Sequence, residues 1–322
     1  VADYCDDNTA QIARAEGANV LERREGPRGR KAFALRALVD TILASPRDYD
    51  AVVVFDADSR IGPAFLRQMA WALDDGAPVL QGKHVIPERD TSAFGSLAAV
   101  DMRLNNLLRN AAKQALGLSC RLMGDAMCFA SWLLREHGWP TSSLGEDREF
   151  GLYLLSRGVR VGYVPQALSY GQAAPSWRDA SGQRLRWYGG DTEIRRSYAL
   201  RLLRQFLHRC DWAALDQAIE LLLPPLSVLA LLSFLLLASQ LAWRSVSLLF
   251  PLPVSTGVAC AWLAFPLIGL LVDRAPAGAY RALVLSPAYL AWRLWMGLRA
   301  LMLGKRVRWV RTRRREEERH TS

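Results

Sequence analysis

Two aspartates stand one residue apart at the end of an apolar, β-branched run. Asp56 and Asp58 flank Ala57 directly after residues 51–55, which we expect to form a buried strand of a parallel sheet. Ligands of open α/β sheets bind at the carboxyl ends of strands, and hard oxygen ligands suit Mg²⁺ or Mn²⁺, which can also hold a diphosphate. The pair is therefore a candidate metal site. A polar strand-to-loop turn is the simpler explanation of the same residues, because aspartate favours turns.

A second acidic pair opens a predicted helix, where Glu146 and Asp147 follow Gly145. Their carboxylates could complement the helix macrodipole, which favours negative charge at its amino end. Alternatively, one of them could act as a general base that takes a proton from an acceptor hydroxyl. These residue types leave both explanations open.

A third group, residues 183–187, has the sequence Gln-Arg-Leu-Arg-Trp. Arginine makes bidentate contacts with phosphate, and tryptophan offers a flat face suited to a sugar ring. An amphipathic helix resting on a membrane would contain the same residues. The basic, glycine-rich residues 26–31 could meet phosphate or form a surface loop. Asp3, Asp6 and Asp7 could hydrogen-bond a nucleoside or form a turn.

Segments of alternating periodicity must position these groups. Apolar residues recur with helical spacing in four segments and form strand-like runs in three: helices at 35–43, 65–73, 97–111 and 146–157, and strands at 51–55, 78–81 and 159–164. Strands that alternate with helices predict an α/β fold with a mostly parallel sheet. The chain begins within this pattern, so we expect its first strand–helix unit to be missing.

Beyond residue 211, long uncharged stretches replace this alternation. Residues 221–243 and 245–272 carry no charge, and each exceeds the roughly 20 residues needed to cross a bilayer. With Arg244 alone between them, they predict a transmembrane hairpin. The next apolar segment contains Arg293 and Arg299. Arginine is costly inside a bilayer, so we favour an amphipathic interfacial helix there over a third span.

Composition narrows the choice of partners. The formal net charge is +10, and much of the excess follows Gly304, directly behind the apolar segments. That placement favours a membrane surface over nucleic acid. The five cysteines form no CxxC pair, which argues against a disulfide framework and fits a reducing compartment. The four histidines lack ligand-like spacing, so we expect no zinc site.

The order of these motifs resembles the family-2 glycosyltransferases, in the membrane-bound branch that includes cellulose, chitin and hyaluronan synthases. The resemblance covers nearly the whole chain and rests on seven segments: residues 1–10, 28–31, 56–58, 124–129, 145–147, 183–187 and 309–312. Each segment is modest by itself. The ordered set that ends in Gln-x-x-Arg-Trp before membrane helices is specific.

The resemblance implies a GT-A (Rossmann-like) fold, a nucleotide-sugar donor (usually a UDP-sugar), Mg²⁺ or Mn²⁺ as cofactor, and inversion at the anomeric carbon. By position, Asp147 would be the base with Glu146 beside it, Asp58 would bind the metal, Asp3, Lys31, Asp56, Gln183 and Arg186 would bind the donor, and Trp187 and Asp125 would contact the acceptor. Gly145 replaces the threonine often found before Glu-Asp, and Asp125-Ala126 departs from the commoner Asn-Gly or Gly-Ser near the acceptor.

The expected organisation has five parts. They are a GT-A catalytic domain over residues 1–190, an amphipathic interface region over 191–216, the hairpin over 217–272, an interfacial or third membrane helix over 280–303, and a basic cytoplasmic tail over 304–322. The implied location is the cytoplasmic (inner) membrane, with several membrane passes and the catalytic domain in the cytoplasm.

The leading hypothesis is transfer of a sugar to a polysaccharide acceptor at the cytoplasmic face, with membrane lipids as partners and further membrane subunits left open. The hairpin is small for a polymer channel, which keeps a lipid acceptor as an alternative. A non-catalytic membrane scaffold with a decayed transferase domain is another. A transporter is disfavoured, because residues 221–272 carry almost no intramembrane charge.

Overall fold

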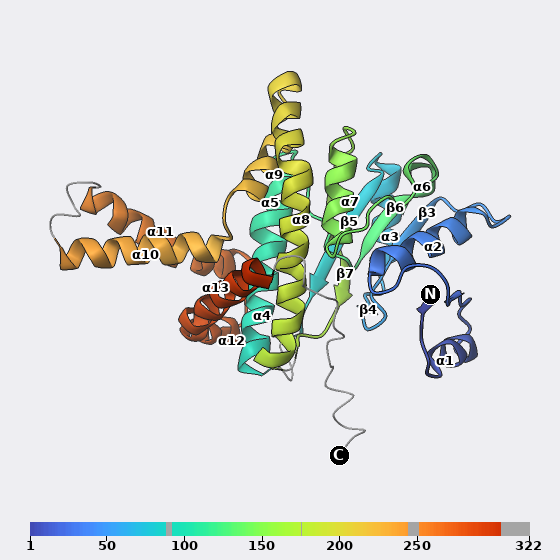
Figure 1. Ribbon diagram of the computed structural model, residues 1–322, viewed down its shortest axis with the longest axis horizontal. Helices are drawn as coiled ribbons and strands as arrows, with labels where there is room; N and C mark the ends of the chain where they lie inside the picture. Colours follow the sequence, from blue (N-terminus) through green and yellow to red (C-terminus); the bar gives the residue numbers. More distant parts are fainter. Residues whose placement is uncertain (88–91, 175, 244–250, 304–322) are drawn as a thin grey trace, which may run out of the picture.

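The computed structural model describes residues 1–87, 92–174, 176–243 and 251–303. Its centre is a five-stranded sheet with the order β3-β6-β5-β7-β4 (Figure 1). The strands are β3 (Ala51–Val54), β4 (Arg60–Ile61), β5 (Val79–Val85), β6 (Met127–Ala130) and β7 (Gly162–Tyr170). The predicted strands at 51–55, 78–81 and 159–164 are thus present.

The expectation of a mostly parallel sheet was wrong. β5 and β7 pair in parallel, whereas β3 with β6, β6 with β5, and β7 with β4 pair antiparallel. β6 lies between β3 and β5 and runs against both, so β3, β5 and β7 still point the same way. Their carboxyl ends therefore share one edge of the sheet, where ligands of α/β sheets bind.

Helices cover both faces of this sheet. On one face, α2 (Lys31–Leu43), α6 (Ser131–His137) and α7 (Glu146–Leu155) pack around Phe129 and Phe150. On the other, α3 (Phe65–Asp74) packs against Cys128 and neighbouring strand residues. Phe129 and Cys128 point to opposite faces because side chains alternate along a strand.

A helical layer lies beside the sheet. It comprises α4 (Ala93–Leu104), a π-helix η1 (Asn105–Ala111), α5 (Ala112–Ala115), α8 (Trp177–Arg209) and α9 (Trp212–Leu222). The helix predicted at 97–111 is present and continues through the π-helical segment. α8 runs without a break through residue 190, where the sequence suggested a domain boundary. It packs with α9 against α7 through apolar side chains.

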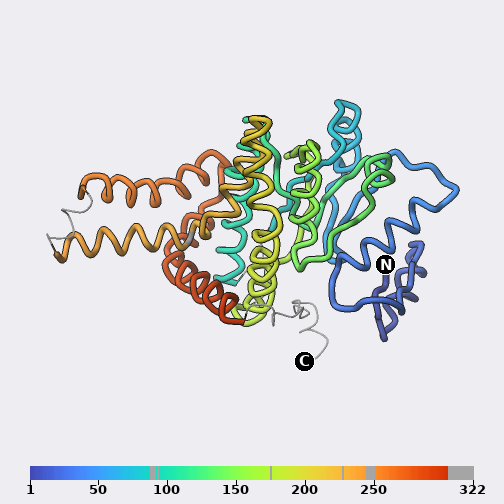
Figure 2. The backbone as a smooth tube through the Cα atoms, turned by 45° about the horizontal axis from the view of Figure 1, so that its top comes forward, coloured from blue at the N-terminus to red at the C-terminus, as the bar shows by residue number. Residues whose placement is uncertain are grey.

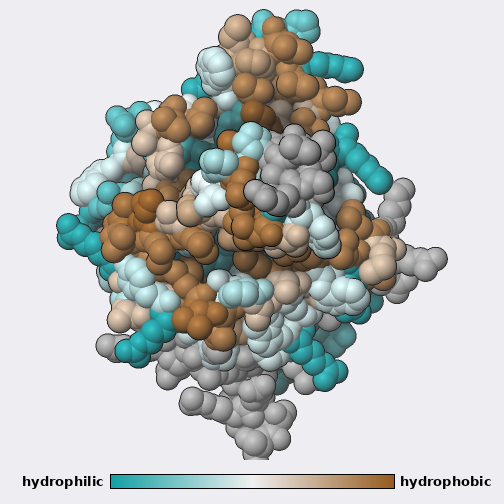
Figure 3. Space-filling view, turned by 90° about the vertical axis from the view of Figure 1, so that its left-hand side faces the viewer, coloured by the Kyte–Doolittle hydropathy of each residue, from teal (hydrophilic) through white to brown (hydrophobic). Residues whose placement is uncertain are grey.

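Two apolar helices, α10 (Leu226–Ala242) and α11 (Leu252–Val272), project together from the body in both views (Figure 1 and Figure 2), and α11 packs against α4 of the body. Figure 3 shows the molecule from the side on which these two helices project, and apolar residues spread across that surface. Leu232, Leu263 and Ile268 are among the exposed ones. Within the described ranges, α11 is the one helix long and apolar enough to cross a membrane. α10, with 17 residues, is shorter than the predicted first span.

The chain then returns to the body through α12 (Ala277–Ala282), a short 3₁₀ turn η3 (Leu283–Leu285) and α13 (Ser286–Leu303). α13 packs against α8 and α10. Arg293, which argued against a spanning helix, is paired with Asp101 of α4, Nη1 to Oδ1 at 3.0 Å. Arg244, the basic tail at 304–322 and the motif at 309–312 lie outside the described residues.

The first 30 residues form a small unit of their own. β1 (Ala2–Asp3) and β2 (Glu22–Arg23) pair in parallel as a separate two-stranded sheet, connected by α1 (Thr9–Ala15). Figures 1 and 2 draw this unit apart from the five-stranded sheet.

Candidate active site

Lys31 joins the start of α2 to the carboxyl edge of the sheet. Its Nζ donates hydrogen bonds to the carboxylate of Asp56, just after β3, and to the carbonyl of Gly124 at 2.7 Å. Burial opposes the ammonium charge, yet the carboxylates of Asp56, Glu146 and Asp147 outweigh it and raise the pKa of Lys31. Lys31 is therefore a fixed positive charge among three carboxylates.

Glu146 and Asp147 form the first turn of α7 beside this lysine. Glu146 is 8% exposed. Burial and the charge of Asp147 raise the pKa of Glu146 to about 7, against the opposing charges of Lys31 and Arg186. Burial also raises the pKa of Asp147, which Arg121 and Lys31 oppose. A carboxyl pair in which burial raises both pKa values is suited to general acid–base chemistry.

Close backbone approaches create this arrangement. Gly124 has φ +82°, and a Cβ there would lie 3.3 Å from Oδ2 of Asp147, so glycine allows the loop to approach the carboxylate. A Cβ on Gly190 of α8 would lie 2.8 Å from the backbone nitrogen of Gly145. Gly190 and Gly145 therefore let α8 cross directly over the turn that begins α7.

That crossing brings Arg186 of the Gln-x-x-Arg-Trp segment close enough to act on Glu146. Gln183, Arg186 and Trp187 precede Gly190 by one to two helical turns, and the charge of Arg186 acts on Glu146. Trp187 is 40% exposed, with the Arg184 guanidinium 4.9 Å from its ring centroid. The contact of this indole with a sugar ring stays a prediction.

The Asp-x-Asp turn lies at the same edge. Ser59 closes it by donating its N–H to the carbonyl of Asp56 at 3.0 Å, and Asp58 is exposed. Within the described part of the chain, no cluster of three or more His, Cys, Asp or Glu side chains could cage a metal. Mg²⁺ in phosphate-handling sites is commonly held by one or two carboxylates and the substrate's phosphates. Asp56 and Asp58 fit that arrangement.

Asp125, predicted to contact the acceptor, is 3% exposed. Its Oδ1 accepts the backbone N–H of Asp56 at 2.8 Å, and its Oδ2 lies 2.7 Å from Nδ1 of His84 and accepts the hydroxyl of Ser169 at 2.6 Å. Sequence reasoning missed His84 and Ser169, since they come from separate strands and match no motif.

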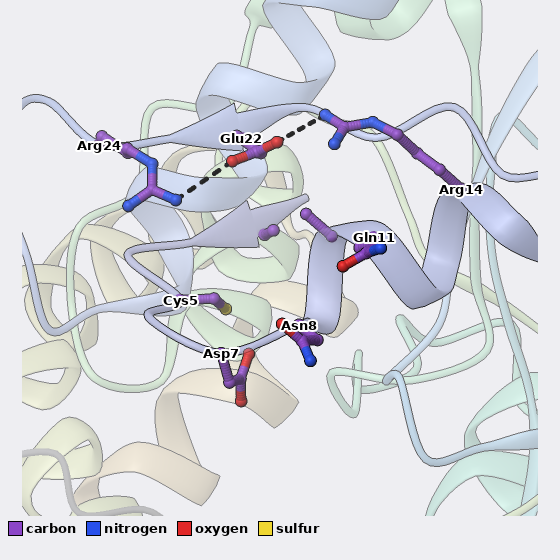
Figure 4. Close-up of a pocket in the computed structure, with 9 residues that line it drawn as sticks. Cys5, Asp7, Asn8, Gln11, Arg14, Glu22 and Arg24 are labelled. Carbon is purple, nitrogen blue, oxygen red and sulfur yellow. Dashed lines mark hydrogen bonds and ion pairs between the residues drawn. The ribbon is translucent and has the colours of Figure 1, made fainter.

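The fold does not place Asp3 beside the other predicted site residues. Its Oδ1 accepts from Nε of Arg23 at 2.5 Å, inside the N-terminal unit. A polar cavity of about 170 Å³ lies in the same unit (Figure 4), where Glu22 pairs with Arg14 at 2.6 Å and with Arg24 at 3.3 Å. Asp3 does not line this cavity.

Comparison with known proteins identifies the family of this chain. The model of "Glycosyl transferase family group 2" matches residues 51–296, well over half of the chain. Among solved structures, the chain is similar to the mannosyltransferase PcManGT from Pyrobaculum calidifontis, whose structure is a complex with GDP-Man and Mn²⁺. The identity is 19%, the TM-score is 0.48, and the match covers 92% of this chain and 75% of that one. No curated protein matches the chain.

Proposed function

Since the chain belongs to glycosyl transferase family group 2 and is a glycosyltransferase, we propose that it transfers a sugar from a nucleoside-diphosphate sugar to an acceptor hydroxyl, with inversion at the anomeric carbon. One observation carries this proposal. Two adjacent carboxyl groups, those of buried Glu146 and half-buried Asp147, lie beside Lys31 at the carboxyl edge of the sheet, and the pKa of Glu146 is raised to about 7. The pair can take up a proton at physiological pH.

In this proposal Asp147 is the base. Its carboxylate removes the proton from the acceptor hydroxyl, while that oxygen bonds to the anomeric carbon on the face opposite the leaving diphosphate. Glu146 shares the proton of the pair and keeps Asp147 basic. Lys31 and Arg186 face the developing negative charge of the diphosphate, where fixed cations stabilise the transition state.

A divalent cation completes the donor site in this proposal. Mg²⁺ or Mn²⁺ would be held by Asp58, with Asp56 beside it, and would supply charge neutralisation for the diphosphate. Gln183 would hold the donor beside Arg186, and Trp187 would stack on the acceptor. Asp3 would approach the nucleoside only if the N-terminal unit lay closer to the sheet edge than it does here.

We keep a polysaccharide acceptor as the first choice and a lipid acceptor as the second. The exposed apolar side chains of α10 and α11, and the length of α11, support attachment to a membrane. A site beside such a hairpin could receive an acceptor from the bilayer, which supports the lipid. The proposed location is the inner membrane, with the site in the cytoplasm and the hairpin crossing or entering the bilayer.

The test is nucleotide release from a panel of UDP- and GDP-sugars, using the whole chain in detergent with Mn²⁺ or Mg²⁺. We expect release with one sugar, loss of it in Asp58→Ala, and no change in Asp48→Asn. Asp48 is a suitable control because it is exposed and pairs only at the surface with Arg135, at 2.7 Å. Turnover of Asp58→Ala equal to the wild type would remove Asp58 from the proposed metal site.

The acceptor and the membrane are tested separately. Labelled product that extracts into organic solvent would favour a lipid acceptor, and product that stays in the aqueous phase would favour a polysaccharide. Flotation of the whole chain with liposomes is expected, because α10 and α11 expose apolar surface that water disfavours. Failure to float in liposomes of any composition would contradict membrane attachment.

A further inference from the structure

A buried polar network lies directly behind Asp56, and the proposed chemistry does not use it. Asp125 is its centre. One carboxylate oxygen accepts the backbone N–H of Asp56 at 2.8 Å, and the other is shared by the ring of His84 at 2.7 Å and the hydroxyl of Ser169 at 2.6 Å. His84 and Ser169 also contact each other, Nδ1 to Oγ at 3.0 Å.

The network joins four strands of the five-stranded sheet. Asp56 follows β3, Asp125 precedes β6, His84 belongs to β5 and Ser169 belongs to β7. The backbone of Asp125 is held as well, because its carbonyl accepts from the side chain of Gln81 at 2.8 Å. One side chain thus fixes the end of β3 relative to three other strands of the sheet.

Both the backbone and the ring of His84 are held in place. Asn106 of the π-helix donates to the backbone carbonyl of His84 at 2.7 Å. A Cβ on Gly171 would overlap Cε1 and Nε2 of the ring. A ring pressed against backbone in this way has little freedom to turn from Asp125.

Asp125 is an ionised acceptor rather than a free carboxyl group. Burial acts against its charge, but hydrogen bonds from His84, Ser169 and the N–H of Asp56 outweigh it and lower its pKa to about 2. With both oxygens bound inside the protein, Asp125 faces the backbone of the Asp-x-Asp turn rather than an acceptor.

We infer that Asp125, His84 and Ser169 are positioning residues, which act through the N–H of Asp56 to fix the Asp-x-Asp turn for the donor's metal and diphosphate. This inference rests on the proposed function. It also reassigns Asp125, from a contact of the acceptor to a support of the donor site. Orienting groups behind a metal site commonly matter for affinity as much as for geometry.

Calorimetric titration of the whole chain in detergent with UDP and with GDP, each with and without Mn²⁺, tests the inference. We expect His84→Ala to weaken the Mn²⁺-dependent binding by roughly 10-fold, the usual worth of a hydrogen bond to a charged group. Binding without Mn²⁺ should not change. His84→Asn should recover most of the affinity, because its amide nitrogen can replace Nδ1 as the donor to Asp125.

Two further variants keep the test independent of folding defects. Ser169→Ala removes one hydrogen bond and little volume, and Asp125→Asn keeps an acceptor for the N–H of Asp56. Each should weaken Mn²⁺-dependent binding less than His84→Ala does, while Asp48→Asn binds as the wild type. Thermal unfolding of each variant identifies any that fail to fold.

The outcomes separate the inference from the proposed function. Equal Mn²⁺-dependent affinity in the wild type and in all network variants overturns the inference, even if the enzyme turns over. Asp125→Asn with normal affinity but low turnover would return Asp125 to the acceptor. Nucleotide binding without turnover on any donor would contradict the proposed reaction alone, and absence of binding in the wild type would overturn both.

Discussion

Consecutive residues of α7 belong to two charged clusters. Carboxylates outnumber cations in one cluster, and cations outnumber carboxylates in the other. Glu146 and Asp147 join Lys31 and Asp56 in the cluster that we propose to be catalytic (the catalytic cluster), where carboxylates outnumber the lysine. Arg148 turns to the other side, to Asp191 at 2.5 Å. There it enters the anchor cluster, which consists of Arg109, Lys113, Arg121, Arg148, Asp191, Asp216 and Glu220.

The pKa shifts of Glu220 and Glu146 show how the balance of charges affects a glutamate in each cluster. In the anchor cluster, four cations surround Glu220, the nearest being Nζ of Lys113 at 2.7 Å, and their charges outweigh burial and lower the pKa of Glu220. In the catalytic cluster, burial and a like charge raise the pKa of Glu146 to about 7. Glu220 therefore stays ionised and holds α9 to α5 and α7, whereas Glu146 can exchange a proton.

Replacing Asp147 by asparagine should give the largest effect. The amide cannot act as a base toward the acceptor hydroxyl, so kcat should fall by about 100-fold to 10,000-fold, the usual contribution of a positioned general base. Stability should not fall, because the change removes a half-buried charge that its surroundings disfavour, as the raised pKa of Asp147 shows. The measurement is steady-state nucleotide release beside Asp48→Asn.

A loss of less than about tenfold in Asp147→Asn would assign the base elsewhere. Glu146 would then be the first candidate, since it shares the site. A large loss that is matched by a lower unfolding midpoint would instead place Asp147 with the structural residues and erase the difference between the two clusters.

Glu220→Gln should act on stability instead. Removing one partner from a buried ion-pair cluster leaves the other charges uncompensated, which costs about 3–5 kcal/mol. We expect a lower free energy of unfolding in denaturant, with turnover per folded molecule close to the wild type. Arg160 pairs at the surface with Asp211 at 3.3 Å and does not belong to the cluster, so Arg160→Gln is a matched surface control.

The pH dependence of that difference has a definite sign. Since the folded-state pKa of Glu220 is lowered, its stabilisation is present above the usual pKa of glutamate and is lost as pH falls through the lower, folded-state value. The gap between wild type and Glu220→Gln should therefore narrow in acid. A gap that is constant with pH would mean that the charge of Glu220 does not stabilise the fold.

Much of the fold was predictable because it is recorded in local patterns. The β-branched residues 51–55 and the helical spacing at 35–43 predicted β3 and α2 correctly. The strand β6 was not predicted at all, and so its direction was not either. Met127–Ala130 is four residues long and buried throughout, so its sequence has no alternation and nothing in it specifies antiparallel insertion between β3 and β5. The sheet was therefore predicted as mostly parallel.

The site shows the same limit. Asp56 and Glu146 follow chain signals that place them at a strand end and a helix start, and the structure brings them together through Lys31. His84 and Ser169 are 85 residues apart and meet only because β5 pairs with β7. The anchor cluster likewise draws on helices distant in sequence. Charges that meet through tertiary pairing have no spacing by which a sequence can reveal them.

The smallest expected effect is a shift of the pH profile in Glu146→Gln. In the wild type, turnover should rise with pH, because Asp147 acts as a base only when it is ionised and burial raises its pKa. Glutamine removes the like charge beside Asp147, which lowers the pKa of the base. The rise should then move to lower pH, with little change of rate on the alkaline plateau. Nucleotide release between about pH 5 and pH 9 measures it, and an unshifted profile would show that the two carboxyl groups titrate independently.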